Sequence, residues 1–330
     1  MPTKTLKIHV EAQAAKPNFR YDIMQPFVQG RAPVEGVEFT FAGAMETAGQ
    51  MENPKFKSGD FGLLDTNIGD VLPAIDNGWD MVPLPILIKR KPIYNLIWVR
   101  ADRGIEKPKD LEGKTWATSM WGVVTTYARG MLAHFHDVDI TTFKWIANVD
   151  GPWPLHKPVN VEYRTDGKPQ WKRLLDGEVD ACSGDIIDPD AWDMLEGSPH
   201  IVKRLFPNYR QMHRDLRRQH GFVTPTHIMV MGGKLHRANP GLSRRIYDAF
   251  ERSREIAIND ARGDGSSYNI VLDTRELFRD QRAELGDIWK HGIAANRELW
   301  DLTMDMYAEQ GQTSRRYSLE EVFPADTLDT

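Results

Sequence analysis

His227 is the side chain of this sequence best suited to transfer a proton, because an imidazole titrates near neutral pH and can change its protonation state during turnover. It precedes the apolar run Ile228–Met231, which has the composition of a strand. We expect His227 to stand at the floor of a ligand site and to deliver a proton there. The alternative is a histidine that only holds hydrogen bonds at a hinge.

A second polar cluster, Asp65–Asn67, follows the short run Asp60–Leu64. Open α/β sheets bind ligands at the carboxyl ends of their strands, so Thr66 and Asn67 are candidates for hydrogen bonds to substrate hydroxyls, and Asp65 is a candidate base. The same three residue types also favour the N-cap of a helix, and a helix-like segment, Ile68–Gly78, comes next. Both roles are compatible.

The segment Ser119–Thr126 enters a helix in which Val124, Tyr127, Ala128, Met131 and Phe135 recur at helical spacing. Free N–H groups at a helix N-terminus favour carboxylates. We expect Ser119 to cap this helix and to contact a ligand together with Met120. Trp121 can stack on an aromatic ring, and the alternative for its side chain is packing within the domain.

Arg90, Ser183 and Asp185 complete the candidate residues. Arg90 can bind a carboxylate through two parallel hydrogen bonds, unless it forms an ordinary ion pair. Ser183 ends the strand-like segment Glu178–Ser183 and Asp185 follows it, and Asp185 is a second candidate base. No short spacing of metal ligands is present, so we expect no metal or other cofactor. The alternative is a divalent cation on Asp185, Asp188, Asp65 and His227.

The elements that must position these groups alternate between strand and helix, which favours an α/β layer with parallel strands. The pattern predicts a strand over Lys144–Ala147 and a helix over Pro189–Glu196, and it predicts two long C-terminal helices. One begins after Asn239 and Pro240. The other is expected from Leu285 to Met306 and stops before Gly311.

The composition is that of a globular protein of one large or two smaller domains. The chain has 330 residues, 41% hydrophobic and 27% charged, and a formal net charge of −5. The small acidic excess gives no electrostatic footprint for nucleic acid. No apolar run approaches the ~20 residues that span a membrane, and Cys182, the single cysteine, excludes an internal disulfide. No secretion signal is visible at the first residues, so we expect a cytoplasmic protein.

The order of elements resembles the type II periplasmic-binding-protein fold, in which two α/β lobes enclose a central ligand cleft. The motifs that carry this resemblance are Ile105–Lys114, which leads into a strand, and Leu175–Ala181, a turn and strand common to that superfamily. The resemblance implies a first lobe from residues 1–100 plus 225–330, with the C-terminal helices packed on it, and a second lobe from residues 101–224.

A narrower resemblance, to the 4,5-dihydroxyphthalate decarboxylase family, covers most of the chain. It rests on short motifs in both halves of the sequence and in the tail: Tyr21-Asp22, Gly30-Arg31, Pro33, Glu35–Val37, Arg90, Arg129-Gly130, Arg204–Tyr209, Gly221-Phe222 with His227, Glu309–Arg316 and Leu319–Phe323. Two segments depart from the family pattern. Ile93 and Tyr94 stand where the family has an arginine and a histidine, and Ser119–Val123 replaces another family motif.

This resemblance implies a cofactor-independent decarboxylase that acts on a small hydroxylated aromatic carboxylic acid, assembles as a homo-oligomer and binds neither nucleic acid nor a membrane. It adds Tyr21 and Asp22 to the residues expected to contact the substrate. Removing CO2 from such a ring requires that the carboxylate be held out of the ring plane and that a general acid protonate the vacated carbon. The alternative is a solute-binding protein or sensor, of the kind used by ABC transporters, that binds a small carboxylate without turnover.

Overall fold

The computed structural model describes residues 5–12, 22–43, 53–148, 153–184, 186, 188–263 and 273–330. The chain divides into two compact units. Unit 1 consists of Met1–Arg90, Arg217–Asp301 and Tyr317–Thr330, and unit 2 consists of Lys91–Leu216 and Leu302–Arg316. Among the described residues, no helix combines the length and the apolar character that crossing a lipid bilayer requires.

The described residues of unit 1 form a five-stranded sheet in the order β2-β1-β3-β11-β4. Its strands are β1 (Leu6–Ala12), β2 (Val37–Gly43), β3 (Leu63–Asn67), β4 (Met81–Arg90) and β11 (Pro225–Gly232). The strands β1, β2 and β3 are parallel, whereas β11 runs antiparallel to both of its neighbours. The helices of this unit are α1 (Gln25–Val28), α3 (Pro54–Lys57), α4 (Ile68–Asp76), α9 (Gly233–Ala238), α10 (Leu242–Arg262), α11 (Thr274–Leu285) and α13 (Leu319–Val322).

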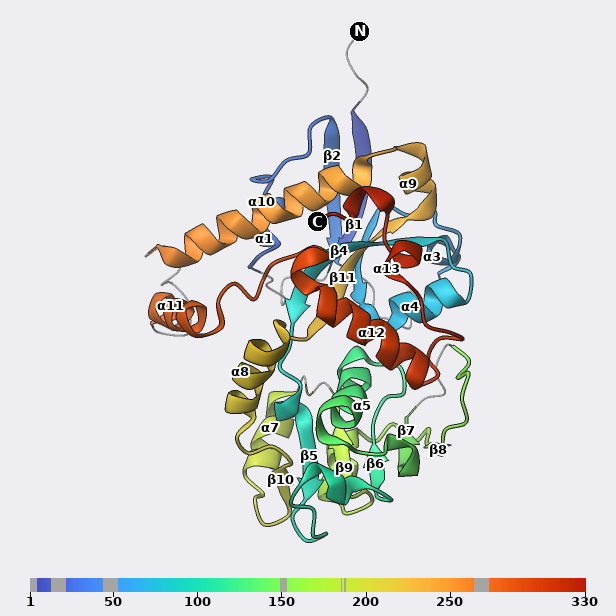
Figure 1. Cartoon of the computed structure of the whole chain (residues 1–330), viewed down its shortest axis with the longest axis vertical. Coiled ribbons are helices and arrows are strands. Elements are labelled where there is room, and N and C mark those ends of the chain that lie inside the picture. Colours follow the sequence, from blue (N-terminus) through green and yellow to red (C-terminus); the bar gives the residue numbers. More distant parts are fainter. Residues whose placement is uncertain are drawn as a thin grey trace. The chain divides into compact units, whose positions relative to one another are not determined.

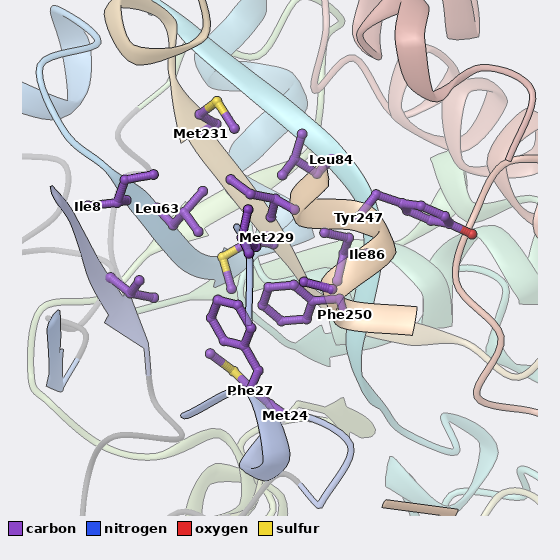
Figure 2. Packing of buried hydrophobic residues seen from close by; sticks show 14 of the residues in the cluster. Ile8, Met24, Phe27, Leu63, Leu84, Ile86, Met229, Met231, Tyr247 and Phe250 are labelled. Carbon is purple, nitrogen blue, oxygen red and sulfur yellow. The ribbon is translucent and has the colours of Figure 1, made fainter. Parts of the chain in front are cut away.

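One face of this sheet and the helices α1 and α10 enclose an apolar core (Figures 1 and 2). Ile8, Leu63, Ile86 and Met229 project from four different strands into this core, and Phe250 projects into it from α10. Side chains two residues apart on a strand share a face, so the apolar residues at alternate strand positions follow from this packing. The C-terminal helix α10 is therefore part of unit 1.

The described residues of unit 2 form a six-stranded sheet in the order β10-β5-β9-β6-β7-β8. Its strands are β5 (Ile97–Arg100), β6 (Thr115–Ala117), β7 (Lys144–Ala147), β8 (Val161–Tyr163), β9 (Ala181–Ser183) and β10 (Val202–Arg204), and its helices are α5 (Val123–His136), α6 (Gln170–Leu175) and α7 (Pro189–Glu196). The predicted strand over Lys144–Ala147 and the predicted helix over Pro189–Glu196 are confirmed. Two helices belong in part to each unit, namely α8 (Tyr209–His220) and α12 (Arg297–Glu309).

The unit boundaries differ from the predicted lobes in three places. The chain returns to unit 1 at Arg217 rather than at residue 225. The strand β5 belongs to unit 2 because it pairs with β9 and β10, so the first boundary lies at Arg90 rather than at residue 100. Residues 302–316 also belong to unit 2. There Thr303 and Gln310 hydrogen-bond to residues of α5, so not all of the C-terminal helical region packs on the first unit.

The predicted helix from Leu285 to Met306 is wrong in its first half. Helix α11 ends at Leu285 and α12 begins only at Arg297. Between them Gly286 and Gly292 have φ angles of +69° and +90°, a backbone region that interrupts a helix. Of the apolar residues that suggested one continuous helix, Ile288 is only partly buried and Ala295 is exposed, so their spacing does not mark one buried helix face.

Candidate functional site

His227 and Asp65 form a buried hydrogen-bonded pair in unit 1. Strands β3 and β11 are paired so that His227 lies opposite Asn67 and Met229 lies opposite Asp65, and these four side chains therefore project from the same face. The Nδ1 atom of His227 lies 2.6 Å from Oδ1 of Asp65. The side chain of Asp65 is fully buried, and that of His227 retains 8% exposure.

The position of Asp65 is unusual for a carboxylate. Leu63 and Met229 on the same face belong to the apolar core, so the alternation of the strand calls for an apolar residue at position 65. A buried carboxylate costs free energy unless it is hydrogen-bonded, and the imidazole of His227 provides such a bond. Asp65 is therefore a polar residue at a position of β3 where the packing favours an apolar one, and such exceptions are often found at functional sites.

The backbone around His227 is irregular on the side of β4. Pro225 pairs with Arg90, His227 with Lys89 and Ile228 with Leu87, so the register shifts on each side of His227. Such bulges redirect side chains and are frequent beside active sites. The sequence pattern predicts that His227 precedes the strand. In the structure His227 is instead the third residue of β11.

Asn67, Thr66 and Thr226 are neighbours of this pair in the sequence, and their side chains have different surroundings. Oδ1 of Asn67 accepts a hydrogen bond of 2.7 Å from the N–H of Gly69, so Asn67 is the N-cap of α4. Thr66 is buried and lies on the opposite face of β3 from Asp65. The Oγ1 atom of Thr226 is buried and has no hydrogen-bond partner within the described part of the chain, and no motif in the sequence marks this residue.

Arg90 holds loops of unit 1 and is not arranged to bind a carboxylate. Its guanidinium donates to the carbonyl oxygens of Val223 at 2.6 Å and Lys290 at 3.0 Å, and to Oδ1 of Asn296 at 2.9 Å. A substrate carboxylate bound to both Nη atoms would have to displace these acceptors. We therefore assign Arg90 a structural role in place of the predicted one.

Asp22 lines a cavity of about 270 Å³ in unit 1 together with Arg90 and Trp289. Neither Asp65 nor His227 is among the residues that line this cavity. Asp22 is therefore brought close to Arg90 but not to the His227–Asp65 pair. Tyr21 and Asp185 lie outside the described residues.

The predicted binding residues of unit 2 surround the start of α5. Gly122 is the N-cap of α5 and offers no side-chain cap. The Oγ atom of Ser119 accepts hydrogen bonds from the N–H groups of Trp121 at 3.4 Å and Gly122 at 3.2 Å, so Ser119 fixes the turn before the helix. Trp121 is buried, and its Nε1–H has no acceptor within the described residues. The predicted contact of this helix end with a ligand carboxylate stays a prediction.

The remaining candidates of unit 2 are engaged inside the domain. The carbonyl oxygen of Met120 accepts hydrogen bonds from Arg129 and Gln312, which leaves its side chain to pack in the interior. Oγ of Ser183 accepts a hydrogen bond of 3.0 Å from Nε1 of Trp116 and is buried. Ser183 thus stabilises the sheet of unit 2.

Neither a reactive thiol nor a metal cluster is found in the described residues. Burial raises the pKa of the Cys182 thiol to about 12, which keeps it protonated and unreactive as a nucleophile at neutral pH. No group of three or more histidine, cysteine, aspartate or glutamate side chains is placed to hold a metal ion among the residues that the structure describes. The His227–Asp65 pair is more deeply buried than the other two histidine–carboxylate pairs of the described residues, His134–Glu309 and His220–Glu298.

Comparison with known proteins places this geometry in context. No protein-family model matches the chain. A curated protein named 4,5-dihydroxyphthalate decarboxylase, from Comamonas testosteroni, is 23% identical over 322 residues, which cover 94% of this chain and 96% of that protein. The similarity thus extends over both units.

Solved structures identify the fold. The putative periplasmic sulfonate-binding protein of Methylobacillus flagellatus KT matches with a TM-score of 0.60 at 12% identity, covering 97% of this chain and 92% of that one. The periplasmic aliphatic sulphonate-binding protein of Escherichia coli matches with a TM-score of 0.54 at 13% identity, covering 98% and 99%. The desulfurization enzyme DSZB matches with a TM-score of 0.52 at 14% identity, covering 97% of both chains. The chain thus has the two-lobed α/β fold of periplasmic solute-binding proteins, and in sequence it resembles a 4,5-dihydroxyphthalate decarboxylase.

Proposed function

We propose that this protein is a decarboxylase of a small hydroxylated aromatic carboxylic acid of the 4,5-dihydroxyphthalate type. The observation that carries the proposal is the buried hydrogen bond between His227 and Asp65. The similarity in sequence to a named decarboxylase along 94% of the chain supports it. The fold by itself does not decide, because the similar structures include binding proteins and an enzyme.

The bond to Asp65 determines which nitrogen of His227 is available for chemistry. In the proposed mechanism Asp65 acts as a carboxylate, which only accepts hydrogen bonds, and Nδ1 of His227 donates to its Oδ1. Nε2 is then the atom that exchanges a proton with a substrate. The carboxylate also orients the ring and offsets its positive charge while both nitrogens are protonated.

The reaction needs one proton and no external electron donor or acceptor. The bond between the ring carbon and the carboxylate breaks, CO2 leaves, and the electron pair remains on the ring carbon. A hydroxyl group para to that carbon makes the ring electron-rich, which lets the carbon accept a proton. The imidazolium of His227 transfers its Nε2 proton to the carbon, and solvent then returns a proton to the ring nitrogen.

The test is turnover of 4,5-dihydroxyphthalate, followed through CO2 release and ring absorbance. The wild-type protein should release CO2, and the His227→Gln variant should lose about 10²- to 10⁴-fold in kcat, the range for a single general acid. Dihydroxybenzoate, the product-like ligand, should bind the variant with nearly unchanged affinity. His236→Gln is a matched control, because the ring of His236 contacts Oγ of Ser243 instead of a carboxylate.

Full turnover by the folded His227→Gln variant would remove His227 from the mechanism.

A second candidate function is a solute-binding protein for a small carboxylate, and it is favoured by the likeness in fold to two sulfonate-binding proteins. The two functions differ in one measurement. A binding protein returns its ligand chemically unchanged after prolonged incubation, whereas a decarboxylase does not.

A further inference from the structure

Unit 2 contains a cavity of about 280 Å³ that none of the functions above requires. Its lining comes from the loop after β6, from α5, from β7 and the segments before β7 and β8, and from the end of α12 and the residue that follows it. The volume is near the lower end of the range for small-molecule sites, about 300 Å³, which suits a ligand with a single ring.

The unusual member of this lining is Arg129, a buried arginine that has no carboxylate partner among the described residues. Its Nε donates to Oε1 of Gln310 at 2.6 Å, and its Nη2 donates to the carbonyl oxygen of Met120 at 3.0 Å. Its Nη1 is 3.5 Å from the thioether sulfur of Met120, and its guanidinium lies 5.5 Å from the ring centre of Trp145. All of these partners are neutral, whereas buried charges in proteins are usually paired with an opposite charge.

A second cation of the lining, Lys157, is in the same situation. Its Nζ donates to the main-chain oxygen of Glu309 at 3.1 Å and to no carboxylate among the described residues. The carboxylates of the lining are already bound by other donors. Asp139 accepts from the N–H and the hydroxyl of Thr141, and Glu309 is bonded to His134. The cavity therefore has two cations that do not pair directly with either carboxylate of its lining.

The other walls are apolar. Ala133 lies on α5, Val138 and Ile140 precede β7, and the indole of Trp145 and the side chain of Val159 complete the surface. A ligand that fits must therefore carry an anionic end for Arg129 and an apolar body for the remaining surface. A flat ring can also pack against Trp145.

Most of the lining lies toward the amino ends of the strands, away from the usual ligand site, and Met120, which follows β6, is the exception. Trp145 is the second residue of β7, and Lys157–Asn160 directly precede β8, so both segments mark the amino ends of their strands. Ligands of open α/β sheets bind at the carboxyl ends, where Ser119 and Trp121 follow β6. Neither of these two residues lines the cavity.

We propose that this cavity is a separate binding site for a small aromatic monocarboxylate of the benzoate type. The carboxylate pairs with the guanidinium of Arg129, Lys157 contributes a second positive charge at the rim, and the ring lies among Ala133, Trp145 and Val159. Binding at this site does not require catalysis by His227, so the experiments below test it separately from the decarboxylase proposal.

Crystals soaked with 4-bromobenzoate test the location. The bromine should give an anomalous peak inside the cavity, with the carboxylate at Arg129. In solution, benzoate binding is measured by isothermal titration calorimetry. Arg129→Met should weaken binding to this site by about 10- to 100-fold, the effect of losing a hydrogen-bonded charge partner.

The variant Ala133→Leu fills the cavity without removing a buried charge, so it tests the site even if Arg129→Met fails to fold. It should abolish the same binding event, whereas Lys144→Met, which removes a cation on β7 outside the lining, should leave the affinity unchanged. Benzoate binding that is unaltered by Ala133→Leu would overturn the proposal. So would an anomalous peak only outside the cavity, or a peak in the crystal without binding in solution.

Discussion

Replacing Asp65 with asparagine keeps the shape of the side chain and removes its charge, so this variant isolates what the carboxylate does for His227. In the native pair the carboxylate accepts from Nδ1 at 2.6 Å and is fully buried. An amide in its place can donate its own hydrogen to Nδ1, which moves the ring proton to Nε2. The ring is then a neutral imidazole whose Nε2–H is too weak an acid to protonate carbon.

Two magnitudes follow from this geometry. A hydrogen bond to a charged group contributes about 1.5–3 kcal/mol, so the free energy of unfolding should fall by about that amount or less, since the amide keeps one hydrogen bond. The rate should fall by about 10²- to 10⁴-fold, which corresponds to about 3–5 kcal/mol of the activation free energy. The effect on the rate therefore exceeds the effect on stability.

The assay compares kcat/KM for 4,5-dihydroxyphthalate with the unfolding free energy from urea denaturation, for wild type and Asp65→Asn. Ser243→Ala is the matched control, because it removes a buried partner 2.9 Å from Nδ1 of another histidine of unit 1, His236. That control should lose stability but keep its rate per folded molecule. The reasoning is refuted if folded Asp65→Asn retains the wild-type kcat/KM, or if the control loses as much activity as Asp65→Asn does.

Two further predictions concern structure. Arg90→Met removes donors to Val223, Lys290 and Asn296 and should lower the unfolding free energy, measured in urea, by about 3 kcal/mol or more. A rise in KM with unchanged stability would instead indicate that Arg90 binds substrate. Burial lowers the pKa of His213 to about 4, and its Nε2 accepts from the N–H of Tyr94, so its share of the stability is complete above pH 6.5 and decreases as the pH falls toward about 4. The slope from this one group is at most about 1.4 kcal/mol per pH unit, and pH-dependent denaturation of His213→Gln should show a shallower dependence than wild type.

The sequence predicted His227 and Asp65 as separate candidate residues but did not predict the hydrogen bond between them. The two residues are 162 positions apart, and the antiparallel pairing of β3 with β11 that joins them is a long-range contact. Local patterns of hydrophobicity carry no information on which strands become neighbours. The apolar run after His227 nevertheless indicated the strand correctly, because periodicity is a local signal.

Arg90 and Arg129 have surroundings that their residue type alone does not reveal. Arg90 was expected to bind substrate, yet the acceptors it holds are distant carbonyl groups that no motif marks. Arg129 had a usable signal. It is the only charged residue from Val123 to Leu132, a stretch of helix that is buried throughout. A lone charge in a helix buried on all sides indicates a paired or ligand-binding group.

The misplaced helix after Leu285 has a simpler cause. Apolar residues continued at helical spacing through Gly286 and Gly292, and the spacing was given more weight than the two glycines. Glycine is the stronger local signal here, because both residues adopt φ angles that other residues rarely reach.

The most direct test of the central claim is decarboxylation in D2O, with the aromatic product examined by NMR. If His227 protonates the ring carbon, the wild-type protein should convert 4,5-dihydroxyphthalate to a dihydroxybenzoate that carries one deuterium at the vacated position, and His227→Gln should form this product at a rate reduced by about 10²-fold or more. Recovery of unchanged 4,5-dihydroxyphthalate from the wild-type protein, or an equal rate of ring deuteration in the folded variant, would contradict the account.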